Sequence, residues 1–312
     1  MTLHIPRRAA LLLPLAFARP THAAEPVRIG YQKLGALVIV RRQALFEALF
    51  APQPVQWVEF GSGPPMLEAL NAGAIDFGAT GDTPPIFAQA AGTDLVYVGA
   101  QPLVGDNQAI LVRDDGPIRS LLDLKGRRVA FTRGSSAHNV VLRALERAGL
   151  TPGDIQPVPL APPDAASAFR TGAVDAWAIW DPFLAIAQQD PAARVLVQGT
   201  DVAPSNTFFL ARRAWATRYP EQVVAMLRAI NRAAEWAAAN PEPLAVLMSE
   251  VTGVPIAAQR VAAVRGVYAV QVMDDAIAAQ QQAIADLFAK FRVLPKSVDI
   301  RTVVWVPPGG GL

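Results

Sequence analysis

A regular alternation of strand-like and helix-like segments between Val27 and Arg212 is the feature that most constrains the fold of this chain. Short apolar runs predict strands at 27–31, 55–60, 76–80, 95–101, 108–113, 128–132, 155–160, 176–180, 194–199 and 206–212. Segments with helical periodicity lie between them, at 36–50, 64–72, 84–91, 137–148, 163–171 and 182–189. This alternation predicts an α/β fold with mostly parallel sheets.

The pattern becomes wholly helical after Arg213. Helices are predicted at 220–239, 241–250, 255–264 and 275–291, followed by an extended piece at 298–305 and a disordered tail at 307–312. With 312 residues, 52% of them hydrophobic, the chain is long enough for two lobes. We expect 108–113 and 206–212 to cross between the lobes. Residues 25–110 and 210–306 then form a discontinuous first lobe, on which the C-terminal helices pack, and residues 111–209 form the second.

Residues 1–23 have the features of a secretory signal peptide. Arg7 and Arg8 precede a short apolar run, and small residues follow, so cleavage is predicted near Ala23/Ala24. The twin arginines permit folded export but do not distinguish it from the general route. Cleavage lowers Lys+Arg from 28 to 25 against 26 Asp+Glu, so the charge changes from +2 to −1. The pI of 9.1 therefore describes the precursor and does not support a nucleic-acid partner.

Four predicted strand-to-helix junctions combine small residues with a helix-capping residue. They contain Gly61-Ser62-Gly63, Gly81-Asp82-Thr83, Gly134-Ser135-Ser136 and Asp181-Pro182. Helix N-termini present free N–H groups and the positive end of the dipole, and in open α/β folds they gather at the carboxyl ends of the strands. A single capping residue is uninformative, because most helices have one. The four junctions together predict a site for an anion that needs no lysine.

The sequence offers little support for an enzyme or a metal site. After cleavage His138 is the one remaining histidine, and the chain has no cysteine, which excludes disulfides, thiolate ligands, cysteine nucleophiles and a lipidated N-terminal cysteine. Ser135 and Ser136 stand near His138, but the G-x-S-x-G elbow and a placed carboxylate are missing. No metal or cofactor is expected. The chain reads as an exported soluble protein.

Several phrases of this sequence resemble the periplasmic aliphatic sulfonate-binding proteins of ABC importers, within the nitrate/sulfonate/taurine group. The most specific are "TGDTPPIFAQAAG" (80–92), "GSSAHN" (134–139) and "DAWAIWDP" (175–182), in that order. Further matching phrases, including "RIGYQK" (28–33) and "VLPKSVDIRTVVW" (293–305), extend over nearly the whole mature chain. The resemblance implies a two-lobed periplasmic binding protein fold of type II. It also implies one ligand in a cleft that closes by hinge motion, and delivery of an alkanesulfonate by a monomer to the membrane permease for sulfur acquisition.

The resemblance, together with the junctions, predicts a set of ligand-binding residues. A sulfonate accepts hydrogen bonds from neutral donors, so fixed dipoles can hold it without a counterion that would have to be desolvated. We expect Trp180 to cover an alkyl chain. Asp82 would cap its own helix or fix nearby donors, and Asp181 would cap the next helix or pair with an amino group on the ligand. The predicted set is Gln32, Gly81, Asp82, Thr83, Ser135, Ser136, His138, Asn139, Trp180 and Asp181.

Other functions stay open at this point. A related binding protein would take taurine, a sulfate ester, nitrate or a thiamine-pyrimidine precursor, and Asp181 with the tail pocket would distinguish these ligands. A lyase-type enzyme on the same scaffold would need an acid/base pair in the cleft. A structural or sensory partner without a ligand is a third possibility, which the small-residue junctions argue against.

Overall fold

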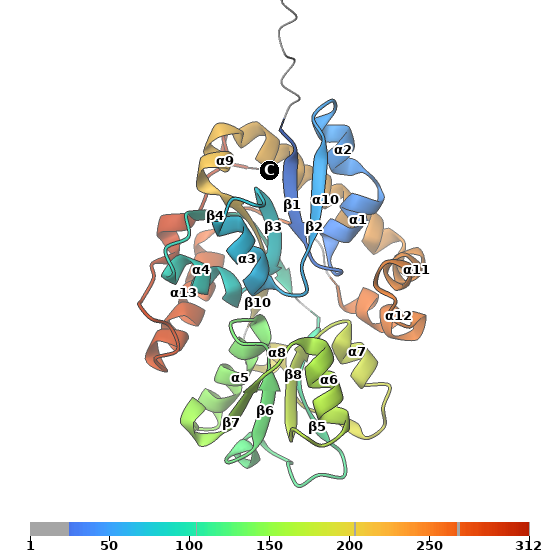
Figure 1. The fold of residues 1–312 in the computed structure, drawn as a ribbon, viewed down its shortest axis with the longest axis vertical. Coiled ribbons are helices and arrows are strands. Elements are labelled where there is room, and N and C mark those ends of the chain that lie inside the picture. Colours follow the sequence, from blue (N-terminus) through green and yellow to red (C-terminus); the bar gives the residue numbers. More distant parts are fainter. Residues whose placement is uncertain (1–24, 104, 203, 267–268, 312) are drawn as a thin grey trace, which may run out of the picture.

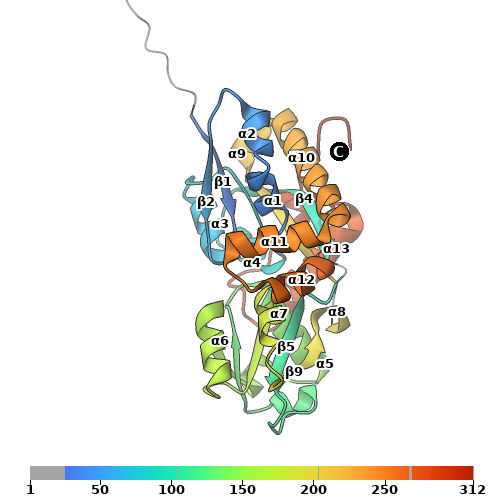
Figure 2. The same cartoon turned by 90° about the vertical axis from the view of Figure 1, so that its right-hand side faces the viewer.

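The computed structural model describes residues 25–103, 105–202, 204–266 and 269–311 (Figure 1). The predicted signal peptide and its cleavage site lie outside these residues. The described chain forms two lobes, one above the other, each built around a five-stranded sheet (Figures 1 and 2). Within the described residues, no helix is long and apolar enough to span a bilayer.

Each sheet has four strands that run one way and a single opposed strand, next to the last in the order. The sheet of lobe I has the order β2 (Val55–Glu59), β1 (Val27–Tyr31), β3 (Phe77–Gly81), β10 (Ser205–Arg212), β4 (Leu95–Leu103). The sheet of lobe II has the order β7 (Gln156–Pro159), β6 (Arg128–Phe131), β8 (Ala176–Trp180), β5 (Gln108–Arg113), β9 (Ala193–Gln198). The opposed strands are β10 and β5, the first strand that the chain adds after each crossing.

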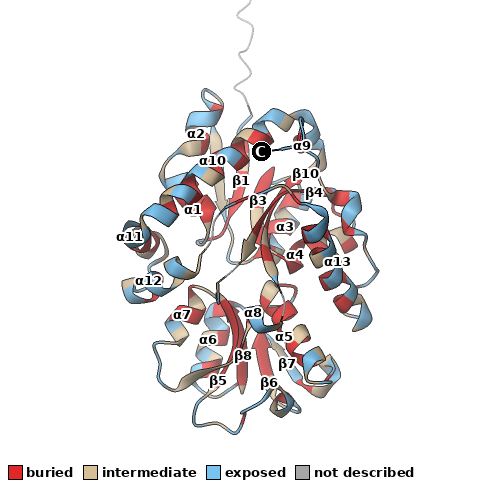
Figure 3. Ribbon diagram, turned by 180° about the vertical axis from the view of Figure 1, so that it is seen from behind, coloured by how far each residue is buried: buried red, intermediate tan, exposed pale blue. Residues whose placement is uncertain are grey.

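Helices cover both faces of each sheet. Those of lobe I are α1 (Ala36–Arg42), α2 (Leu45–Phe50), α3 (Gly63–Asn71), α4 (Thr83–Ala90), α9 (Arg213–Arg218), α10 (Pro220–Ala239), α11 (Pro241–Thr252), α12 (Ile256–Arg265) and α13 (Asp275–Lys290). Those of lobe II are α5 (Ser136–Arg147), α6 (Pro162–Arg170), α7 (Phe183–Ala187) and α8 (Gly199–Val202). One apolar core of lobe I joins its sheet to α1, α2 and α10, and another joins it to α3, α4 and α13. The central strands β3, β8 and β5 are mostly buried (Figure 3).

The predicted fold class is confirmed, and most predicted elements are present within two residues at each end. Two differ. The helix predicted at 36–50 is two helices, because Ala44 takes a left-handed conformation with φ of 51° between α1 and α2. The segment predicted as extended at 298–305 contains a 3₁₀ turn (Ile300–Val303). Val304, which follows this turn, makes an isolated bridge to Tyr97.

The chain crosses between the lobes twice among the elements described. All of β5 pairs in the sheet of lobe II and all of β10 in that of lobe I, so the crossings lie between β4 and β5 and between β9 and β10. The predicted lobe limits at 110 and 209 fall inside these two strands.

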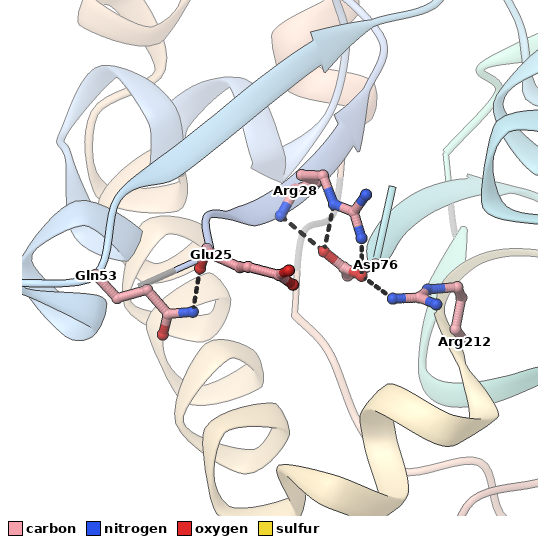
Figure 4. A network of polar contacts seen from close by, with 5 residues as sticks. All are labelled: Glu25, Arg28, Gln53, Asp76 and Arg212. Atoms are coloured by element: carbon pink, nitrogen blue, oxygen red, sulfur yellow. Dashed lines mark hydrogen bonds and ion pairs between the residues drawn. The ribbon is translucent and has the colours of Figure 1, made fainter. Parts of the chain in front are cut away.

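The two lobes repeat one structural unit. In lobe I, Asp76 before β3 accepts hydrogen bonds from the backbone N–H of Arg28 at 3.0 Å and from the guanidinium groups of Arg28 and Arg212 (Figure 4). In lobe II, Asp175 before β8 accepts from the backbone N–H of Arg128 at 2.8 Å and from its guanidinium. Each aspartate thus joins the starts of two neighbouring parallel strands, at the end of the lobe far from the other lobe (Figure 1).

Candidate functional site: the cleft between the lobes

A cleft of about 940 Å³, counting the solvent-filled space at its mouth, lies where the two lobes meet. The strands β1, β3, β6 and β8 end at it, as expected for ligand sites in open α/β folds. From lobe I it is lined by Gln32, Leu34, Gly35, Gly63, Thr80, Gly81, Pro84, Gln101, Leu103, Thr207, Met248, Gln259, Ala262, Ala263 and Gly266. From the first crossing and lobe II it is lined by Asn107, Gln108, Ser135, Ser136, Trp180, Asp181 and Pro182.

The polar groups of this lining are mostly neutral. Among the described lining residues Asp181 carries the one charge, and the others with polar side chains are amides, hydroxyls and an indole. An anion in the cleft would therefore be held by hydrogen-bond donors and backbone dipoles rather than by a cation.

The N-terminus of α5 supplies the strongest set of such donors. Ser135 is the N-cap in extended conformation, and its hydroxyl donates to Thr132 O at 2.7 Å. The hydroxyl of Ser136 has no hydrogen bond to another described residue. The N–H groups of Ser136 and Ala137 belong to the first turn, where an α-helix leaves them without an intrahelical acceptor. Two N–H groups and one hydroxyl are therefore without a partner among the described residues, and Ser136, which carries two of these three groups, lines the cleft.

Gly134 shapes this helix start through its backbone. Its φ is 73°, a conformation that favours glycine, whereas a Cβ there would meet Phe87 only at an ordinary 3.8 Å. A close approach between the lobes occurs at Gly81, where a Cβ would lie 3.0 Å from Ser136 Oγ. The two junctions lie face to face across the cleft.

The start of α4 offers fewer backbone donors than its sequence implies. Pro84 and Pro85 occupy its first turn and have no N–H group. The hydroxyl of Thr83 donates to Asp82 Oδ1 at 2.8 Å, and Thr83 is fully buried. This junction therefore contributes shape through Gly81 and Pro84 more than hydrogen bonds.

The ten predicted site residues divide into two groups. Six line the cleft: Gln32, Gly81, Ser135, Ser136, Trp180 and Asp181. Four are buried behind its surface: Asp82, Thr83, His138 and Asn139.

Asp82 organises the buried group. Its carboxylate accepts from Ser205 Oγ at 2.9 Å and Asn139 Nδ2 at 3.2 Å, in addition to Thr83. Burial raises the pKa of Asp82, and these three hydrogen bonds oppose that rise. Because Asn139 belongs to α5 of lobe II, Asp82 connects the two lobes. This matches the expected role of fixing nearby donors, although no Asp82 side-chain cap closes the start of α4.

His138 is part of a packed aromatic contact between the lobes. Its ring stacks on Phe131 at a centroid distance of 4.6 Å and meets the edge of Phe288, from α13, at 5.0 Å. Its Nδ1 accepts from the N–H of Gly134 at 3.2 Å. Burial, with a smaller contribution from the charge of Arg133, lowers the pKa of His138 to about 4, so the ring is neutral at pH 7.

Asp181 follows β8 directly and lines the cleft. Its Oδ1 accepts from the N–H of Ala185 in the first turn of α7 at 3.0 Å, although Pro182, and not Asp181, is the N-cap residue of that helix. Its carboxylate also pairs with Arg265 of lobe I. Burial raises the pKa of Asp181 to about 6, although the charge of Arg265 and both hydrogen bonds oppose this rise.

Comparison with known proteins agrees with this geometry. Residues 55–243 match the family model described as NMT1/THI5 like. The chain is 43% identical over 304 residues to an aliphatic sulfonates-binding protein of Escherichia coli (strain K12), covering 96% of this chain and 95% of that protein. It is 34% identical over 283 residues to one of Bacillus subtilis (strain 168), covering 89% and 85%.

The chain belongs to the aliphatic sulfonate-binding proteins of the NMT1/THI5-like family.

Solved structures of this family have the same architecture. The periplasmic aliphatic sulphonate binding protein SsuA from Escherichia coli matches with a TM-score of 0.84, covering 91% of this chain and 93% of that one. The alkanesulfonate-binding protein SsuA from Xanthomonas axonopodis pv. citri, bound to MOPS, matches with 0.86 at 42% identity, covering 91% and 99%. The nitrate-binding protein NrtA from Synechocystis PCC 6803, at 17% identity and 0.72, shows the fold alone.

Sequence reasoning missed part of the cleft of this family member. Gln108 begins β5, and its position on a predicted crossing strand was a usable signal. The wall formed by α12 and the glycine that follows it has a weaker signal. Gln259, Ala262, Ala263 and Gly266 lie at spacings of three and four, and all but Gln259 are small. Met248 of α11 and Thr80 of β3 had no signal that separates them from ordinary core residues.

Proposed function

We propose that this protein is the substrate-binding component of an ABC importer and captures alkanesulfonates in the cleft for sulfur acquisition. The observation that carries the proposal is the anion-compatible start of α5, which faces Gly81 in a cleft with no cation among its described lining residues. Relatives with 43% and 34% identity are named for binding aliphatic sulfonates.

The chemistry of a sulfonate fits these donors. A sulfonate stays ionised across the physiological pH range, so it needs no proton from the protein and no pH-dependent partner. We assign its oxygens to the N–H groups of Ser136 and Ala137 and to the Ser136 hydroxyl, with further donation from Gln32. Thr80 Oγ1 is buried, lines the cleft and has no partner among the described atoms, so it is an additional donor.

The apolar part of the cleft suits the organic tail of such a ligand. Trp180 offers an indole from lobe II, and Met248, Ala262 and Ala263 face the cleft from α11 and α12 of lobe I. Tail contact is therefore assigned to both lobes, which favours hinge closure over the bound ligand.

The ten predicted residues then take two roles. The six that line the cleft are assigned to ligand contact: Gln32, Gly81, Ser135, Ser136, Trp180 and Asp181. The four buried behind it are assigned to support: Asp82, Thr83, His138 and Asn139. His138 supports by packing, and the other three by fixing the junction of the lobes through hydrogen bonds.

The biological setting follows from the same proposal. The chain is exported to the periplasm after removal of residues 1–23, and works there as a monomer that docks on a membrane permease. The lobes are those predicted, residues 25–110 with 210–306 and residues 111–209, except that the limit at 110 moves to the start of β5 and the limit at 209 to the start of β10. Residues 307–312 are a tail. It binds no nucleic acid and performs no chemical turnover, because Asp181 is the one acid or base among the described lining residues.

Binding by the purified mature protein tests the proposal. Alkanesulfonates should raise the thermal midpoint, whereas nitrate and sulfate should not, because neither fills the apolar wall. No shift with any alkanesulfonate would contradict the proposed function.

Two matched serine variants test the site itself. Ser136→Ala should weaken alkanesulfonate binding about tenfold, because it removes a hydroxyl donor to a charged group. Ser135→Ala should have a smaller effect, because that hydroxyl already donates to Thr132 O. Calorimetric titration measures both, and equal effects would contradict the placement of the sulfonate at Ser136.

A further inference from the structure

The ion pair between Asp181 and Arg265 lies at the edge of the cleft and joins the lobes. Arg265 ends α12 in lobe I, and its Nη1 is 3.4 Å from both carboxylate oxygens of Asp181 in lobe II. Its Nη2 donates to Gln188 Oε1 at 2.8 Å, at the other end of α7. The side chains of Arg265 and Asp181 are 20% and 11% exposed, respectively. Asp181 lines the cleft, whereas Arg265 is not among the described lining residues.

The backbone fixes Arg265 in this position. Gly105, in the crossing between β4 and β5, lies against Arg265, and a Cβ on Gly105 would overlap the Arg265 carbonyl oxygen. The N–H of Asp181 donates to Asn107 O of the same crossing at 2.9 Å. Both partners of the ion pair are therefore held on one short segment, so the pair is part of the lobe junction and not a chance surface contact.

The ion pair removes an electrostatic repulsion that Asp181 would otherwise exert on an anion in the cleft. Asp181 is the one charged residue among the described lining residues, and it has the same sign as the proposed ligand. A largely buried carboxylate repels an anion at short range more strongly than an exposed one, because water screens it less. A cation held against it cancels this repulsion. It also removes the attraction that a bare carboxylate would have for an ammonium group on a ligand.

We propose that Arg265 is a positioning residue that sets ligand specificity: by neutralising Asp181 it lets the cleft accept sulfonates with uncharged tails and reject those with an ammonium group. This proposal rests on the proposed function. Arg265 acts through Asp181 and does not itself touch the ligand.

The test compares two ligands that differ by one ammonium group, propane-1-sulfonate and 3-aminopropane-1-sulfonate. Calorimetric titration gives the ratio of their affinities for the wild type, Arg265→Gln and the double variant Arg265→Gln/Asp181→Asn. The ratio should favour propane-1-sulfonate in the wild type and fall at least about tenfold in Arg265→Gln, because Asp181 is then an uncompensated charge. The double variant should restore preference for the uncharged tail.

Two further variants keep the test decisive. Lys290→Gln removes the cation of another ion pair between the lobes, with Glu146 at 2.9 Å, on the α13 side of the molecule and away from the cleft lining (Figure 1). It should leave the affinity ratio unchanged. If Arg265→Gln does not fold, Asp181→Asn alone replaces it. That variant leaves Arg265 without its counterion, so the ratio should rise in favour of propane-1-sulfonate.

The possible failures are distinguishable. A wild type that binds neither sulfonate contradicts the proposed function. A wild type that binds propane-1-sulfonate, with the same ratio in Arg265→Gln, overturns the role of Arg265 alone. A double variant that behaves as Arg265→Gln does would also overturn it, because the effect would then not pass through Asp181.

Discussion

Each lobe has an aspartate at either end of a central strand. The first, Asp76 before β3 or Asp175 before β8, pairs with arginine, and we call this pair the Arg–Asp unit. The second follows the same strand, and the two lobes satisfy its charge by different means. Asp82 follows β3, is fully buried and accepts from three neutral side chains. Asp181 follows β8, lines the cleft and pairs with a guanidinium. In both cases one donor comes from the opposite lobe: Asn139 for Asp82, and Arg265 for Asp181.

The difference shows how one repeated unit serves two tasks. Behind the cleft surface, three neutral donors satisfy the hydrogen-bonding capacity of Asp82 without placing a cation beside it. At the cleft surface an anion is expected nearby, so only a full positive charge cancels Asp181. The same contrast of burial separates the Arg–Asp units, since the side chain of Asp76 is 4% exposed and that of Asp175 28%.

The largest expected effect concerns these Arg–Asp units. Asp76→Asn should lower the free energy of unfolding by about 3 kcal/mol, because it leaves two arginines beside a buried site without their counterion. Asp175→Asn should cost only about 1 kcal/mol, since that pair is more exposed. Urea denaturation at pH 7 measures both. Equal losses would mean that the two units are energetically alike despite their different burial.

The Asp76 effect should also depend on pH. Burial alone would raise the pKa of Asp76, but hydrogen bonds from Arg28 and Arg212 more than offset it and the pKa is lowered. A carboxylate with a lowered pKa stabilises the fold above its unfolded-state pKa, and loses this contribution as the pH falls through its folded-state pKa. The difference between wild type and Asp76→Asn should therefore shrink in acid.

Asp181 should show the opposite sign. Its pKa is raised to about 6 in the folded protein. Its contribution is therefore fully present below the unfolded-state pKa and is lost as the pH rises through about 6. Relative to Asp181→Asn, the wild type should lose about 2 kcal/mol of stability between pH 4 and pH 8. Denaturation of both proteins across this range measures it, and a constant difference would contradict the raised pKa.

The smallest effect tests the neutral donors of Asp82. Ser205→Ala removes one of three hydrogen bonds, so it should cost about 1 kcal/mol of stability. Ser249→Ala is a matched control, because its hydroxyl donates to Val254 O within α11 and its following turn. A loss of several kcal/mol from Ser205→Ala alone would show that Asp82 depends on this single donor, as Asp181 depends on Arg265.

Much of the fold follows from local pattern. The segments 220–239 and 176–180 are helix and strand as predicted, because their periodicity and composition agree with their burial. The cleft residues that followed the strand-to-helix rule, such as Ser136 and Trp180, were also found. Those contributed by α11 and α12 were not, since these residues lie inside helices and not at a strand-to-helix junction.

By itself, the sequence determined the alternation of strands and helices, the helix starts at the carboxyl ends of the strands and the absence of cysteine chemistry. These are local properties, set by backbone sterics, capping and side-chain type. Only the tertiary structure decided which junction keeps its donors free, which aspartate is buried and which faces the cleft. Asp82 and Asp181 occupy matching places in the chain. Their environments differ because the partners, Asn139 and Ser205 for one and Arg265 for the other, are distant in sequence and meet them only when the lobes pack.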